Sequence, residues 1–150
     1  MKTRKMMEVP EGKTISGASI RLGVPKNGVL GVAEGVETAL SAFHATEIRT
    51  WSTVNTGTME SFIVPQDIHI EPIHTVLIWA DKDKSKRGAI AAGILSARLQ
   101  SEGVRTYILT PNDPIPPKAK GIDWNDVLLK HGRAGFPRAS YLREFLSRNT

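Results

Sequence analysis

The stretch Thr75-Val-Leu-Ile-Trp-Ala-Asp81-Lys-Asp83 decides the fold, because an apolar run ends there in two acids. A continuous apolar run bounded by polar residues is typical of a strand that is buried on both faces of a parallel sheet. Ligands bind such sheets beyond the carboxyl ends of the strands, where Asp81 and Asp83 fall. Two carboxylates this close repel each other unless a cation lies between them. The stretch therefore indicates either a Mg²⁺ site, held by carboxylates, phosphate and water, or two solvated loop acids.

Composition is that of one soluble globular domain. The chain has 150 residues, of which 40% are hydrophobic and 23% charged, and this is enough to bury a core. No apolar run approaches the roughly 20 residues of a membrane span. The basic start of the chain has no apolar segment after it, so it is not a signal peptide. Cysteine is absent, which excludes disulfides and thiolate zinc sites. We expect a cytoplasmic protein with no membrane partner.

Positive charge suggests a polyanionic partner. The net charge is +5 and the isoelectric point about 9.7. The densest cluster, Lys82, Lys84, Lys86 and Arg87, interleaves with the two acids and follows them. Acids that can bind metal beside bases that can bind phosphate form a more specific pattern than net charge alone.

A second acid follows a second apolar run. Residues 29–33 (Val-Leu-Gly-Val-Ala) predict a buried strand, and Glu34-Gly35 comes directly after it. An amphipathic helix is predicted next from the apolar stripe Val36, Ala39, Leu40 and Phe43. Glu34 is then either an acid stabilised by the helix N-terminus or a general base or metal ligand at the same sheet edge. We expect Gly35 to permit a tight turn and a close backbone approach.

The remaining pattern alternates strands and helices. Strands are predicted at 50–55 and 104–109, and a small helix at 56–63. A longer helix is predicted at 86–102, with an apolar side made of Ile90, Ala91, Ile94, Leu95 and Ala97. A final helix is predicted at 137–148, and residues 14–22 fit a short strand or hairpin. This alternation predicts a doubly wound, mostly parallel sheet flanked by helices, with a short N-terminal strand or hairpin and a C-terminal helix.

A third group of acids follows a proline-rich loop. Residues 111–120 contain four prolines and lead to Gly121-Ile-Asp123-Trp-Asn125-Asp126, after which a short helix runs to near Gly132. Asn125 is either the cap of that helix or part of a site. Glu34, the Asp81 pair and Asp123 each follow a predicted strand or a loop leaving one. All of them can therefore meet at one edge of the sheet.

Three motifs in this order resemble the Toprim domain, which bacterial-type primases, type IA and type II topoisomerases and several nucleases share. The resemblance is strongest to the primases and primase–helicases of phages and plasmids. The motifs are Glu34-Gly-Val-Glu-Thr-Ala-Leu-Ser41, Asp81-Lys-Asp-Lys-Ser-Lys-Arg-Gly88 and Asp123-Trp-Asn-Asp-Val-Leu128. The resemblance covers about residues 16–129. We accordingly expect a linker or arm at 1–15 and a Toprim catalytic domain at 16–150.

The resemblance implies roles for the acids. Glu34 would act as general base or metal-linked acid, Asp81 and Asp83 would hold Mg²⁺ or Mn²⁺, and Asp123 would be an additional acid. Asp126 would support the metal. Nucleotide or nucleic-acid contacts would come from Gly35, Lys82, Lys84, Lys86, Arg87 and Asn125.

The leading hypothesis is the catalytic core of a DNA primase, which makes RNA primers from ribonucleoside triphosphates on a single-stranded DNA template. A Toprim nuclease or DNA-nicking enzyme is one alternative, and a non-catalytic nucleic-acid-binding replication module is another. Bacterial-type primases add a zinc module and a basic N-terminal subdomain, which this cysteine-free chain does not show. We therefore expect a domain of a larger primase or primase–helicase, or a short relative, that works with helicase and template-binding domains or subunits.

Overall fold

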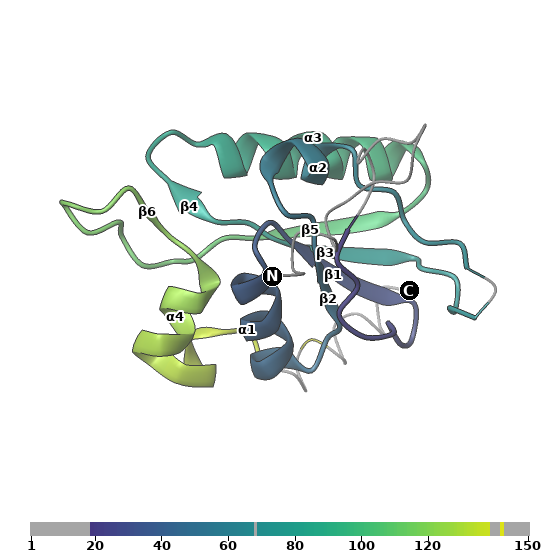
Figure 1. Ribbon diagram of the computed structural model, residues 1–150, viewed down its shortest axis with the longest axis horizontal. Coiled ribbons are helices and arrows are strands. Elements are labelled where there is room, and N and C mark those ends of the chain that lie inside the picture. Colours follow the sequence, from purple (N-terminus) through teal and green to yellow (C-terminus); the bar gives the residue numbers. More distant parts are fainter. Residues whose placement is uncertain (1–18, 68, 139–141, 143–150) are drawn as a thin grey trace, which may run out of the picture.

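The computed structural model describes residues 19–67, 69–138 and 142. Its elements alternate as the sequence predicts (Figure 1). In chain order they are β1 (Val29–Ala33), α1 (Val36–Thr46), β2 (Thr50–Ser52), α2 (Thr56–Glu60), β3 (Thr75–Trp79), β4 (Lys82–Asp83), α3 (Arg87–Ser101), β5 (Arg105–Leu109), β6 (Gly121–Ile122) and α4 (Trp124–His131), followed by a 3₁₀ turn (Gly132–Gly135).

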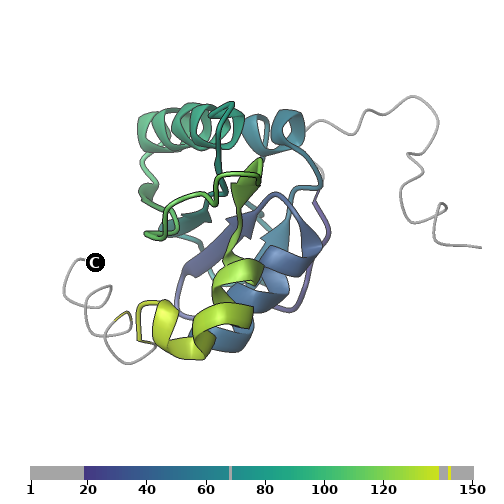
Figure 2. The ribbon, with the colours of Figure 1, turned by 90° about the vertical axis from the view of Figure 1, so that its left-hand side faces the viewer.

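Four parallel strands in the order β2-β1-β3-β5 form the main sheet. The central pair, β1 and β3, is in register along its whole length, from Val29 opposite Thr75 to Ala33 opposite Trp79. Helices α2 and α3 lie on one side of the sheet and α1 and α4 on the other (Figures 1 and 2). The doubly wound, parallel fold expected from the sequence is confirmed.

Strand side chains alternate between two cores, as the pleat of a strand requires. Leu30 and Val32 of β1 face the core under α2 and α3, and residues 76 and 78 of β3 do the same. Leu77 and Trp79 of β3 face the core under α1 and α4. Both faces of the sheet are thus covered, and that explains the uninterrupted apolar run of β3.

An aromatic cluster fills the second core near the end of β3. The rings of Trp79 and Trp124 meet edge to face at a centroid distance of 5.1 Å. Phe136 packs on Trp124 at 4.8 Å, and the Trp124 indole N–H donates to the carbonyl oxygen of Leu109 at 3.0 Å. Trp124, the first residue of α4, therefore packs on the last residue of β3 and is hydrogen-bonded to the last residue of β5.

The predicted buried faces of two helices are partly wrong. On α1, Leu40 is 49% exposed, whereas the small residues Ala39 and Ala42 are fully buried. On α3, Ile90 is 57% exposed, and Leu95 is fully buried. Ile94 and Ala97 are exposed too. Small side chains let both helices approach their neighbours closely, so the larger aliphatic groups lie at the flank.

Two further differences concern the ends and a short sheet. β4 and β6 pair antiparallel beside the main sheet, a pairing that the sequence analysis did not predict. Of the expected N-terminal strand, Ile20 forms an antiparallel bridge with Ser52, and residues 14–18 lie outside the described part of the chain. The expected arm at 1–15 lies outside it as well. So does most of the expected helix at 137–148, apart from Pro137, Arg138 and the buried Leu142.

Candidate metal and nucleic-acid site

Two acids lie at the carboxyl ends of the neighbouring central strands. Glu34 directly follows β1, and one residue separates Asp81 from the end of β3. The last residues of the two strands are paired. From this point the chain leads outward in both directions, from β1 to β2 and from β3 to β5. Such a reversal of strand order opens a crevice where doubly wound proteins bind their ligands. Glu34 and Asp81 therefore lie at the switch point of the sheet.

Asp81 is the most perturbed acid of this site. Its Oδ1 atom is buried and has no hydrogen-bond partner among the residues that the structure describes. Burial raises the pKa of Asp81 to about 7, and the nearby charges of Asp123, Glu34, Asp83 and Asp126 add to the effect. A buried acceptor without a donor is costly, as is a carboxylate among carboxylates. The site therefore lacks a positive partner for this oxygen.

Glu34 is perturbed in the same direction. Burial raises the pKa of Glu34 above its usual value, and the charge of Asp83 raises it further. The guanidinium group of Arg87 acts against both effects. A carboxylate whose pKa is raised accepts a proton more readily than a solvated one, as general-base chemistry needs.

Asp83 has a second role that the sequence analysis did not predict. Its Oδ1 accepts hydrogen bonds from the Ser85 hydroxyl at 2.7 Å and the Arg87 backbone N–H at 3.2 Å. Its Oδ2 accepts from the Gly88 N–H at 3.3 Å. Asp83 thus caps the start of α3. Lys86, the residue before that helix, is left-handed (φ 63°) and makes no side-chain cap.

These hydrogen bonds shift the pKa of Asp83 in the opposite direction to that of Glu34 and Asp81. Burial alone raises the pKa of Asp83, but the hydrogen bonds from Ser85 and the backbone outweigh it, and the pKa lies below its usual value. Gly88 makes the arrangement possible. A Cβ on Gly88 would lie 3.2 Å from the Asp81 carbonyl oxygen and 3.3 Å from the Asp83 carboxylate, closer than most side chains tolerate.

Asp123 and Asp126 cap α4 reciprocally. The Asp126 N–H donates to Asp123 Oδ1 at 2.8 Å, and the Asp123 N–H donates to Asp126 Oδ2 at 2.9 Å. This capping box starts α4 at Trp124, three residues before the predicted start. The helix cap is Asp123, so the alternative that Asn125 caps the helix is wrong. Burial, with the charge of Asp126, leaves the pKa of Asp123 above its usual value.

Asn125 instead joins α4 to α1. Its Oδ1 accepts from the Ser41 hydroxyl at 2.9 Å, and its Nδ2 donates to Glu37 Oε2 at 3.3 Å. Glu37 and Ser41 lie four residues apart and therefore on one face of α1. This spacing of two polar residues was the feature of the sequence that could have indicated a shared partner. The first and third motifs are therefore hydrogen-bonded to each other.

The basic residues of the second motif make contacts outside the acids. Lys82 Nζ donates to the Asp113 carbonyl oxygen at 2.8 Å and Lys84 Nζ to that of Pro117 at 3.0 Å, so both hold the proline-rich loop. Arg87 donates to the Thr56 hydroxyl at 3.3 Å, and its charge acts on Glu34. Lys84, Lys86 and Arg87 are exposed, as are Lys118 and Lys120 of the proline-rich loop.

The chain bends at Glu34 and Gly35, between β1 and α1, where the turn was expected. The bend does not require glycine, because a φ of −93° and a ψ of 154° are open to any residue. A Cβ on Gly35 would meet no atom of the described residues within 4 Å, so no close backbone approach is seen. Gly35 leaves open space beside Glu34.

The donor set suits Mg²⁺. Among the residues that the structure describes, no three acidic or histidine side chains stand ready as a closed cage for an ion. Mg²⁺ is usually bound through only one or two carboxylates plus substrate phosphates and water. Asp81 Oδ1, which has no hydrogen-bond partner within the described ranges, is a carboxylate oxygen of the kind that such a site uses. The charges of Glu34 and Asp123 act on Asp81, so these two acids lie near it.

Fold and site together define an α/β domain with an acidic centre at a sheet switch point. The family model of the Toprim domain matches residues 29–134, which is most of the chain. The chain therefore belongs to the Toprim family. Toprim domains occur in primases, nucleases and topoisomerases, generally bind Mg²⁺ through acidic residues and act on nucleic acids. No curated protein matches this chain.

None of the helices in the described ranges has both the length and the apolar character needed to cross a bilayer.

Proposed function

We propose that this chain is the Toprim catalytic core of a DNA primase, which joins ribonucleotides on a single-stranded DNA template within a larger primase or primase–helicase. The observation that carries the proposal is the electrostatic interaction of Asp81 with Glu34 and Asp123 at the end of β3, in a segment that also carries the exposed cations Lys84, Lys86 and Arg87. Phosphoryl transfer needs a proton acceptor, charge neutralisation at the phosphate and an aligned hydroxyl. Acids and bases in this arrangement supply the first two.

In the proposed step, a 3′-hydroxyl oxygen attacks the α-phosphorus of a ribonucleoside triphosphate. The bond from that phosphorus to the bridging oxygen breaks, and pyrophosphate leaves. Glu34 would take the hydroxyl proton, and its raised pKa supports this role because it favours protonation during the step. Bound Mg²⁺ or Mn²⁺ would neutralise charge on the transferring phosphate.

The other residues position the reactants. Asp81 and Asp123 would hold the metal, with Asp126 in support, while Asp83 keeps the start of α3 in place. Exposed Lys86 and Arg87 would contact phosphates of the nucleotide or template. Lys82 and Lys84 keep ammonium donors beyond the one that each gives to the proline-rich loop.

One incubation distinguishes the candidate activities. Labelled single-stranded DNA is mixed with the four ribonucleoside triphosphates and Mg²⁺ or Mn²⁺, with and without the protein. New short RNA strands support the primase. Shortened label supports a nuclease, for which the same acids would activate water, and an intact but retarded label supports a binding module. Glu34→Gln is the matched control, because it removes the proton acceptor and keeps the shape.

A further inference from the structure

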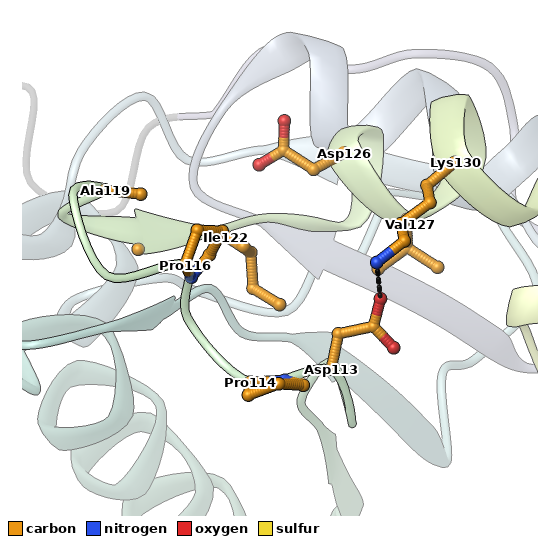
Figure 3. A pocket seen from close by; sticks show the side chains of 9 residues that line it. Asp113, Pro114, Pro116, Ala119, Ile122, Asp126, Val127 and Lys130 are labelled. Atoms are coloured by element: carbon orange, nitrogen blue, oxygen red, sulfur yellow. Dashed lines mark ion pairs between the residues drawn. The ribbon is translucent and has the colours of Figure 1, made fainter.

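A groove lies between the proline-rich loop and the first turns of α4, with a volume of about 280 Å³ (Figure 3). Its walls are mainly apolar and come from Pro114, Pro116, Ile122 and Val127. Asp126 lies at one end, and the ion pair of Asp113 with Lys130, 3.6 Å long, lies at the other. The groove is therefore a short apolar slot with polar ends.

The loop wall of this groove is fixed in place by several contacts. Asp113 accepts from His131 Nε2 at 2.7 Å, in addition to its ion pair with Lys130. Lys82 and Lys84 hold the loop from the opposite side through its carbonyl oxygens. Gly121 allows β6 to lie against β4, because a Cβ at this position would come within 2.4 Å of the Lys82 carbonyl oxygen. The groove is thus formed before any ligand arrives.

The groove and the acidic centre share one residue, Asp126. It lines the groove, its charge acts on Asp81, and its carboxylate accepts from the Asp123 N–H. A ligand in the groove therefore lies against the residue that links it to the acids. The volume of the groove lies just below the range of ligand pockets, about 300 to 1,000 Å³, so it suits one planar ring with a sugar and excludes a duplex.

We propose that this groove receives the base and ribose of a mononucleotide whose phosphates lie at the acidic centre. The proposal rests on the proposed function, since it supplies the binding site for the incoming triphosphate. Proline and aliphatic walls cover the faces of the heterocycle. Polar ends at Asp126 and at the Asp113–Lys130 ion pair flank these walls.

The test compares nucleotides with a ligand that has phosphates alone. Each ribonucleoside triphosphate, inorganic tripolyphosphate and each free nucleoside is titrated by calorimetry into the whole chain, with Mn²⁺ present. We expect at least one nucleotide to bind about tenfold more tightly than tripolyphosphate, since burying about 60 Å² of apolar surface suffices for that ratio. Equal affinities of tripolyphosphate and all four nucleotides would overturn the groove and leave the proposed function standing.

Substitutions test whether the groove causes the tighter binding of the nucleotide relative to tripolyphosphate, here called the nucleotide advantage. Ala119→Trp places a large ring at the groove and should remove this advantage, while the affinity for tripolyphosphate stays unchanged. Leu129→Trp is the control. Leu129 is an exposed residue of α4, the helix that forms the other wall, and it does not line the groove. Pro114→Ala removes one exposed wall and lowers the advantage about threefold, which covers the case that Ala119→Trp does not fold. A nucleotide advantage that persists in both groove variants would overturn the proposal.

Two outcomes separate this proposal from the proposed function. Nucleoside binding that Ala119→Trp or Pro114→Ala weakens, with no binding of tripolyphosphate, would uphold the groove and count against a phosphate site at the acids. No binding of any nucleotide, nucleoside or tripolyphosphate would overturn both.

Discussion

The carboxylates of the site fall into two groups that obtain their positions in different ways. Glu34 and Asp81 follow buried parallel strands, and Asp81 has an oxygen without a hydrogen-bond partner in the described part of the chain. Asp83 and Asp123 cap helices and accept backbone hydrogen bonds. Burial raises the pKa of the strand-end acids and so costs stability. The hydrogen bonds of the cap acids contribute stability, which outweighs burial for Asp83, whereas the pKa of Asp123 stays raised.

The largest expected effect comes from the strand-end group. Asp81→Asn keeps the shape of the side chain and removes its charge, so the affinity for Mn²⁺ should fall by at least about 100-fold, beyond the loss usual for a supporting residue. Calorimetric titration of Mn²⁺ measures it. Asp67→Asn is the control, because Asp67 forms an exposed ion pair with Arg21 outside the site. Unchanged Mn²⁺ affinity in Asp81→Asn would remove this residue from the metal site.

The metal-free protein should lose stability with rising pH because of the same residue. The pKa of Asp81 is about 7 in the folded protein against 3.8 for a free side chain, so folded Asp81 keeps a proton that the unfolded chain releases. Its stabilising effect is complete below pH 4 and is lost as pH rises to about 7. After allowance for solvent screening, we expect roughly 2 kcal/mol.

Urea unfolding of wild type and Asp81→Asn at pH 4 and pH 7, in the presence of a chelator, measures this difference. Wild type should be less stable than the variant at pH 7 and similar to it at pH 4. The comparison of variants cancels the opposite pH dependence of Asp83 and Asp113, whose pKa values are lowered. Equal stabilities at both pH values would show that burial and the neighbouring acids do not raise the pKa of Asp81.

A cap acid should behave in the opposite way. Asp123→Ala removes the oxygen that accepts from the Asp126 N–H and should lower the free energy of unfolding by about 1 kcal/mol. Asp123→Ser restores a capping oxygen without the charge, so it should recover most of the stability and none of the metal affinity. Urea unfolding and Mn²⁺ titration of both variants test this. If Asp123→Ser were as unstable as Asp123→Ala, capping would not be the role of this side chain.

The smallest effect is expected at Gly35. Its backbone conformation suits alanine, so Gly35→Ala should change stability by less than about 1 kcal/mol, and in the stabilising direction, through the unfolded chain. A loss of binding to single-stranded DNA in this variant would then mean that the open space beside Glu34 is used by the ligand. Thermal unfolding and fluorescence anisotropy with labelled DNA measure the two effects. Gly93→Ala, a substitution that also meets no neighbour, is the control.

The main sheet was predictable because its signals are local. The run from Thr75 to Trp79 is buried at every position, as its composition indicates, and the acids that follow it lie at the expected sheet edge. The family motifs placed Glu34 and Asp123 near it. The sequence thus predicts strands that are continuous apolar runs, and the acids that come directly after them.

What was missed depends on contacts between distant segments. A two-residue strand such as β4 has no periodicity to detect. Its partner β6 is distant in the sequence, since Lys82 pairs with Ile122 and Asp83 with Gly121. The capping by Asp83 was hidden because Lys86 is left-handed and shifts the helix start. Leu40 is exposed because alanines mediate the contacts of α1, which a hydrophobic stripe does not reveal.

The paired indoles near the site have an optical consequence. Trp79 lies two residues before Asp81 and Trp124 directly after Asp123, and their rings meet edge to face at 5.1 Å in a buried cluster. Chromophores this close couple their electronic transitions, and the resulting near-ultraviolet circular dichroism depends on their mutual angle. Any ligand that draws Asp81 and Asp123 together should therefore alter that signal. The protein contains its own reporter of site closure and needs no attached dye.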